Sequence, residues 1–162
     1  MKGQLSYEYY VSLLIFLLAS FYVMLKINQY LPPFKEFVLK QRIYSEAYQL
    51  SEILVNDPGE PPDWNLSNVK RIGLQHQLKK KNLVSSYKIN LLNESCEKFG
   101  YSFIKDKLGV PQDVDFRLSV FKDDKLLVSC GIDKRYSIKE SLSRTVYIDG
   151  KDYGKVVVEV FK

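Results

Sequence analysis

The sequence predicts an α+β protein in which a long, kinked N-terminal helix is followed by an antiparallel β-sheet head. Three observations carry this prediction. An apolar run covers Tyr9–Ile27, helical periodicity of apolar residues resumes over 34–55, and alternating apolar and polar residues recur after residue 113. A chain of 162 residues holds one folded head in addition to an anchor helix.

The apolar run is long enough to cross a membrane. Its 19 residues span about 28 Å as a helix, close to the thickness of the hydrocarbon core of a bilayer. Only Ser12, Ser20 and Lys26 interrupt it, and Lys26 lies close enough to the end for its amine to reach the interface. No convincing signal-peptidase site follows the run, so we expect the helix to remain as a single-pass membrane anchor.

A short polar leader comes before the run. The leader, MKG, ends in a small residue and is followed directly by QLSYE. These residues resemble the class III signal peptide of archaeal type IV pilin-like proteins, in which a Q-x-S-x-E motif follows a glycine that a prepilin peptidase cleaves. Gln4, Ser6 and Glu8 match the three fixed positions of the motif, and Gly3 matches the cleavage position.

The resemblance implies a structural function. On this resemblance, cleavage after Gly3 would make Gln4 the new N-terminus, and the chain would then become a subunit, expected to be a minor one, of a pilus-like filament at the cell surface. Its partners are the prepilin peptidase, membrane lipid before assembly, and other pilin subunits through the apolar helix. Glu8 would pair with the α-amine of Gln4 on a neighbouring subunit and set the register of adjacent helices. The alternative is that Glu8 only marks the water boundary.

The resemblance extends to shorter segments further along the chain. These are LVNDPGEPPDWN at 54–65, VKRIGL at 69–74, LGVPQDVDFRLSV at 108–120 and SLSRTVYIDG at 141–150. The implied organisation is a leader at 1–3, a transmembrane and filament-core helix at 4–27, an extension of that helix at 28–56, and a globular head at 57–162. Pro32 and Pro33 are expected to break or kink the helix, since neither donates a backbone hydrogen bond.

Local patterns predict the elements of the head. Alternation of apolar and polar residues predicts a strand over 87–91, and apolar spacing predicts a helix over 94–108. Further strands are expected at 114–121, 126–130, 142–148 and 155–161. Asp123-Asp124 and the segment 149–154 are expected to form hairpin turns. Trp64, in the proline-rich loop, is expected to pack on the core.

Two features would suit an extracellular head. Cys96 and Cys130 form either one disulfide or two buried thiols, and export through the anchor would favour the disulfide. Asn65 and Asn93 begin N-x-S sequons and are candidate N-glycosylation sites. The distribution of basic residues opposes this topology. Only Lys2 and the initiator amine precede the apolar run, whereas four cations lie at its end or after it, between residues 26 and 42, and this excess would place the head in the cytoplasm. We give the processing motif more weight than that distribution.

Catalytic and nucleic-acid-binding patterns are not evident. The net charge of +5 comes from interspersed charges, which does not predict a nucleic-acid surface. Lys79, Lys80 and Lys81 indicate a solvated turn, or a contact with an acidic partner or lipid headgroups. His76 is the single histidine, and the acids between Asp57 and Asp63 lack the spacing of a calcium loop. We therefore expect no enzyme, cofactor or metal site.

Two other functions remain as alternatives to a filament subunit. The first is a membrane-anchored extracellular binding or adhesion module that never enters a filament. The second is an exported enzyme, which lacks sequence support because no nucleophile, base or metal cluster is recognisable.

Overall fold

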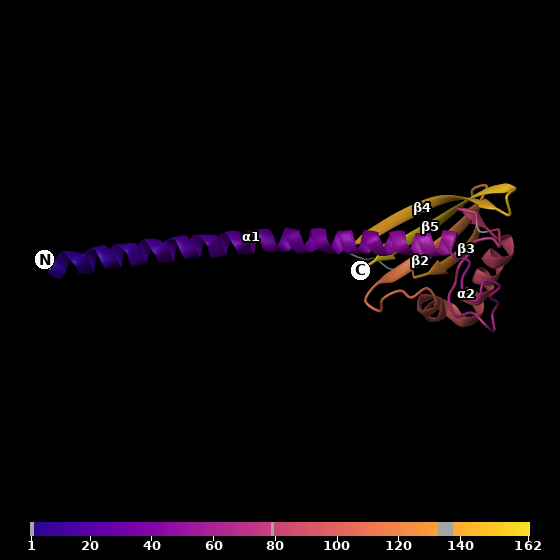
Figure 1. The fold of residues 1–162 in the computed structure, drawn as a ribbon, viewed down its shortest axis with the longest axis horizontal. Coiled ribbons are helices and arrows are strands. Elements are labelled where there is room, and N and C mark those ends of the chain that lie inside the picture. Colours follow the sequence, from indigo (N-terminus) through magenta and orange to yellow (C-terminus); the bar gives the residue numbers. More distant parts are fainter. Residues whose placement is uncertain (1, 79, 133–137) are drawn as a thin grey trace. The chain divides into compact units, whose positions relative to one another are not determined.

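The computed structural model describes residues 2–78, 80–132 and 138–162, with the backbone alone for 2–6. Its elements in chain order are α1 (Lys2–Asn56), β1 (Leu83–Val84), α2 (Ser86–Lys107), β2 (Asp115–Lys122), β3 (Lys125–Gly131), β4 (Lys139–Ile148) and β5 (Asp152–Phe161) (Figure 1). The chain divides into two compact units, Met1–Leu39 and Lys40–Lys162, so that α1 contributes residues to both. The α+β class predicted from the sequence is confirmed.

Helix α1 continues through Pro32 and Pro33, which both lie inside it. In a regular helix their missing N–H groups would have bonded the carbonyls of Asn28 and Gln29. Both of these residues are exposed, so the helix need not end to satisfy their backbone oxygens. The predicted break is therefore wrong, while a kink at this point stays a prediction. The helix ends at Asn56, close to the expected end at residue 55.

The sheet of the second unit is mixed, which corrects the prediction of an antiparallel sheet. Its strand order is β1-β4-β5-β2-β3. Strands β4, β5, β2 and β3 pair with their neighbours in antiparallel orientation, whereas β1 pairs with β4 in parallel. Strand β1 contains only Leu83 and Val84, which is too short for an alternating pattern to reveal it.

The four longer strands predicted from alternation are confirmed, and so are their turns. Lys122 faces Lys125 across the β2–β3 hairpin, which leaves Asp123 and Asp124 as a two-residue loop. Both aspartates have positive φ, as a type I′ turn requires. At the β4–β5 turn, Asp149 also has positive φ.

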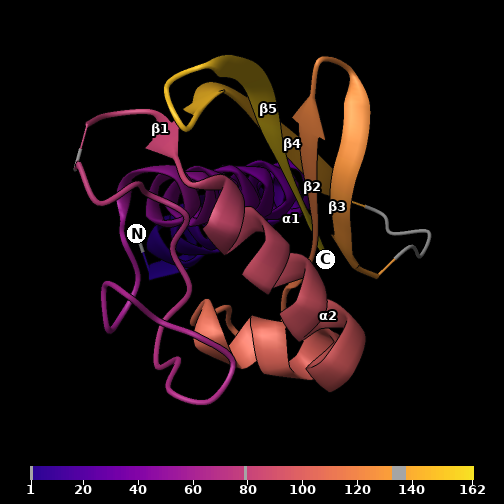
Figure 2. The same ribbon diagram turned by 90° about the vertical axis from the view of Figure 1, so that its right-hand side faces the viewer.

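The core lies on one face of the curled sheet, beneath α2 and the last part of α1 (Figure 2). Every second residue of the strands is buried on this face. In β5 the buried residues alternate with more exposed ones, as the alternation of apolar and polar residues in the sequence predicts. Ile43, Ala47, Leu50 and Leu54 bury the facing stripe of α1. The other face of the sheet carries mainly polar side chains.

The strand predicted over 87–91 is wrong, because these residues belong to α2. Tyr87 is 63% exposed, whereas Lys88, Ile89 and Leu92 are buried with the spacing of a helix face. In the sequence Lys88 stands between Tyr87 and Ile89 as a polar residue, which produced the alternating pattern of a strand. The helix predicted over 94–108 is confirmed as the later part of α2, which is interrupted at Gly100, where the backbone is not helical.

Candidate functional site

The first compact unit carries apolar side chains all round α1. Six consecutive apolar residues, LLIFLL, occupy positions 13–18, and a helix distributes such a run over its whole circumference. Every residue from Tyr7 to Leu25 is exposed, and Phe16 is 67% exposed. The mean hydropathy of the most apolar stretch is 2.1, so α1 is long and apolar enough to cross a membrane. An apolar surface of this size is expected to be covered by lipid or by other proteins.

The residues of the processing motif belong to the start of this helix. The backbone of Gly3, Gln4 and Ser6 is helical, and their side chains lie outside the described residues. Glu8 follows Gln4 by about one turn, is exposed, and has no ion-pair partner in the part of the chain that the structure describes. The carboxylate therefore stands beside the apolar segment with its charge open to an external cation.

Cys96 of α2 and Cys130 of β3 form a disulfide. Their Cα atoms are 6.1 Å apart and their positions in the chain differ by 34. The Cys130 side is buried, with 1% of the residue exposed. The bond ties α2 to β3, which is one of the two edge strands of the sheet.

The two sequons differ in how accessible they are. Asn65 lies in a turn, where its Oδ1 accepts hydrogen bonds from the N–H and the hydroxyl of Ser67, and Ser67 is exposed. Asn93 lies inside α2, and its Nδ2 donates to Glu97 Oε1 at 2.6 Å. The sequon serine Ser95 is fully buried, with its hydroxyl bonded to the Leu91 carbonyl. The Asn65 sequon, with a half-buried asparagine and an exposed serine, is therefore the more accessible of the two.

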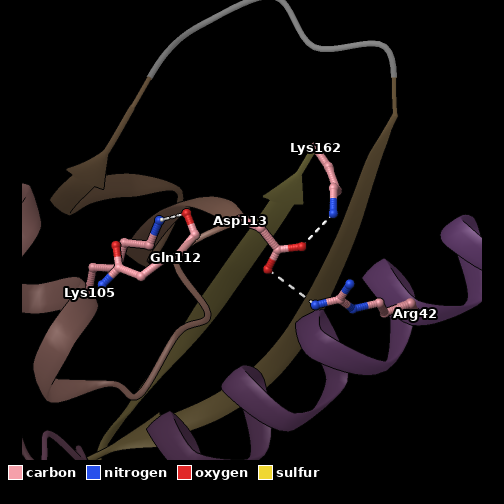
Figure 3. A network of polar contacts seen from close by, with 5 residues as sticks. All are labelled: Arg42, Lys105, Gln112, Asp113 and Lys162. Atoms are coloured by element: carbon pink, nitrogen blue, oxygen red, sulfur yellow. Dashed lines mark hydrogen bonds and ion pairs between the residues drawn. The ribbon is translucent and has the colours of Figure 1, made fainter.

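Asp113 links three segments of the second unit (Figure 3). Its Oδ1 accepts a hydrogen bond from Arg42 Nη2 of α1 at 3.2 Å, and its Oδ2 accepts one from Lys162 Nζ. The hydrogen bond from Lys162 holds the pKa of Asp113 below its usual value, with Arg42 adding to the effect. Beside it, Lys105 Nζ donates to the Gln112 carbonyl at 3.1 Å. Arg42, Asp113 and Lys162 are about one third to one half exposed, so their ion pairs position segments more than they stabilise the head, whereas Lys105 is buried.

Trp64 and Lys88 hold two loops together, a role that the sequence did not indicate for Lys88. Trp64 is fully buried, as predicted, and its Nε1 donates to the Gly73 carbonyl at 2.8 Å. Lys88 is 4% exposed, and its Nζ donates to the carbonyls of Pro58 at 2.6 Å and Gln75 at 3.0 Å. Burial lowers the pKa of Lys88, although Asp57 acts in the opposite direction. A cation inside an apolar helix face is the one sequence signal that could have indicated this contact.

Asp149 anchors the start of α2 to the β4–β5 turn. Its Oδ1 accepts from the Ser86 N–H at 3.0 Å, and its Oδ2 accepts from the Ser86 hydroxyl. Burial acts to raise the pKa of Asp149, but the two hydrogen bonds from Ser86, with His76 and Lys151, lower it overall. The Ser85 side chain makes no capping hydrogen bond at the start of α2. The Asp149 carboxylate instead accepts a backbone N–H of the first turn.

The residues considered for metal binding and catalysis have other contacts. Asp57 pairs with Arg71 Nη2 at 2.8 Å and accepts the Gly59 N–H at 2.7 Å. His76 is half-buried, and its Nδ1 accepts the Leu78 N–H at 3.2 Å. Among the described residues, no group of three His, Cys, Asp or Glu side chains could hold a metal ion. Lys80 and Lys81 are exposed, and Lys79 lies outside the described residues.

Comparison of the chain with models of protein families, with curated protein sequences and with solved structures finds no match.

Proposed function

We propose that this chain is a prepilin-like subunit of an archaeal type IV pilus-like surface filament. The observation that supports the proposal is the exposed apolar segment of α1, preceded at once by the Gly3 to Glu8 motif. The segment can lie in a bilayer before assembly and pack against other copies afterwards, since both environments cover apolar side chains. The disulfide between Cys96 and Cys130 suits a head that is exported to an oxidising environment.

In this proposal cleavage after Gly3 creates the partner of Glu8. The new α-amine of Gln4 is positively charged at neutral pH, and a carboxylate in an apolar bundle needs an opposite charge close to it. Within one subunit, Gln4 and Glu8 lie on the same helix, so the amine of a neighbouring subunit is the partner that fixes the relative position of two helices. The apolar residues after Glu8 then pack in the filament core.

The N-terminus of the mature protein tests the first step. Mass spectrometry of the chain isolated from a cell that has the peptidase should find Gln4 as the first residue. Gly3→Val should block the cleavage while leaving membrane insertion unchanged. An N-terminus at Met1 in the wild-type chain would contradict the proposal.

Substitutions of Glu8 test the pairing. Glu8→Ala should be inserted and cleaved normally but enter filaments at least tenfold less, while Glu8→Asp, which keeps the charge, should recover part of the assembly. Shearing of cells without detergent separates the filament fraction from the membrane fraction. Recovery of the wild-type chain only in the membrane fraction would favour an anchored binding module instead, and equal assembly of Glu8→Ala would refute the register role.

A further inference from the structure

The head contains a pocket whose walls come from three separate segments of the second unit. Its volume is about 390 Å³, within the range typical of small-ligand sites. The lining residues are Asp63 and Trp64 of the proline-rich loop, His76, Gln77 and Ser85 of the segment before α2, and Tyr87 and Lys88 of its first turn. None of these residues is used in the proposed filament assembly.

The floor of the pocket is held in place by buried contacts. Trp64 is fixed by its hydrogen bond to Gly73, and Lys88 joins the two loops through the carbonyls of Pro58 and Gln75. The backbone at Gly73 approaches Asp57 so closely that an added Cβ would lie 2.2 Å from the Asp57 carbonyl oxygen. The walls are therefore formed before a ligand arrives, which lowers the entropy cost of binding.

The rim offers hydrogen-bonding groups of several kinds. Asp63 and Gln77 are exposed, and they supply a carboxylate and an amide. Ser85 makes no capping hydrogen bond with its hydroxyl. His76 uses Nδ1 as an acceptor, so in the neutral ring Nε2 carries the proton and donates. The Tyr87 ring, 63% exposed, adds an apolar surface beside these groups.

The charges around the pocket favour a neutral ligand over an anion. Asp63 at the rim repels anions and offsets the charge of the Lys88 ammonium below, which uses two of its three N–H groups on the carbonyls of Pro58 and Gln75. Asp57 beneath the loop is paired with Arg71. A polar ligand that both donates and accepts hydrogen bonds, and that has a C–H face for an aromatic ring, matches this set of groups.

From this arrangement we infer that the pocket binds a neutral sugar residue. Sugar hydroxyls would donate to Asp63 and accept from Gln77 and His76, while the ring C–H groups would lie on Tyr87. This inference concerns the head alone and does not depend on filament assembly, so either proposal can fail without the other.

Binding can be measured on the full chain in a detergent that has no sugar head group. Trp64 is the single tryptophan of the chain and lines the pocket, so its fluorescence reports on occupancy. Glucose, galactose, mannose and N-acetylglucosamine are titrated separately, with sodium sulfate as the anion probe, and saturation-transfer NMR on the sugar protons provides a second readout. A saturable response to at least one sugar in the millimolar range is expected.

Two variants and a control locate the binding. Tyr87→Ala and Gln77→Ala each replace an exposed side chain and should weaken the sugar affinity at least tenfold. Tyr153→Ala removes a comparably exposed tyrosine that does not line this pocket, and should leave the affinity unchanged. The inference is overturned if no sugar gives a saturable signal by either readout, if only sulfate binds, or if both pocket variants bind as the wild type does.

Discussion

Loss of the Cys96–Cys130 disulfide should lower the free energy of unfolding of the head by about 3.7 kcal/mol. The bond closes a loop between positions that differ by 34. The chain-entropy relation for a loop of this length gives about 3.7 kcal/mol at 25 °C. For a domain of this size, a loss of that magnitude corresponds to a fall in Tm of roughly 10 to 15 °C. Because β2 and most of β3 lie inside the loop, the cross-link restricts an unfolded segment that must form the β2–β3 side of the sheet.

Urea and thermal unfolding of the full chain, followed by the fluorescence of buried Trp64, measure this effect. The comparison needs the oxidised wild type, the reduced wild type and the double variant Cys96→Ala, Cys130→Ala. The reduced wild type keeps both sulfur atoms and so separates the cross-link from the small cavity that alanine leaves. If reduction costs less than about 1 kcal/mol, the entropic reasoning is refuted. If only the double variant is destabilised, packing of the sulfur atoms accounts for the effect.

Two further predictions concern Asp149 and the sequons. Asp149→Asn should destabilise the head by about 0.5 to 1 kcal/mol at pH 7, since its bonds to Ser86 lose their charge. The pKa of Asp149 in the folded protein lies below its ordinary value of 3.8, so this stabilisation is present above pH 4 and is lost as the pH falls through the lowered pKa. Urea unfolding should therefore show the two proteins converging in acid, and a constant difference down to pH 2 would contradict the assignment. In a host that glycosylates exported sequons, Asn65→Gln should remove glycan mass and Asn93→Gln should not. A mass loss on Asn93→Gln would show that Ser95 becomes accessible before it is buried.

Much of the head could be predicted because its sheet has one buried and one solvated face. In β5, Val156, Val158 and Val160 are buried while Lys155 is exposed, so the alternation appears directly in the sequence. The Asp123-Asp124 turn was equally visible because few residues tolerate positive φ.

The errors arose where a contact distant in sequence decides the structure. Lys88 is buried because carbonyls of two other loops accept its N–H groups, and no local pattern contains that information. Leu83 and Val84 become a strand only by pairing with Tyr147 and Ile148, more than 60 positions later. The same limit applies to the pocket, since its lining groups come from segments that only the fold brings together.

The position of β5 in the sheet also determines when the head can fold. Strand β5 lies between β4 and β2, yet it follows every other strand in the chain. Until a ribosome has completed β5, the β2–β3 hairpin and β4 have no common neighbour, and Val156, Val158 and Val160 are missing from the core. The sheet of the head therefore cannot be completed before β5 has been synthesised. A truncation before β5 therefore removes the strand that joins the two parts of the sheet, and with it the folded head, rather than shortening the head.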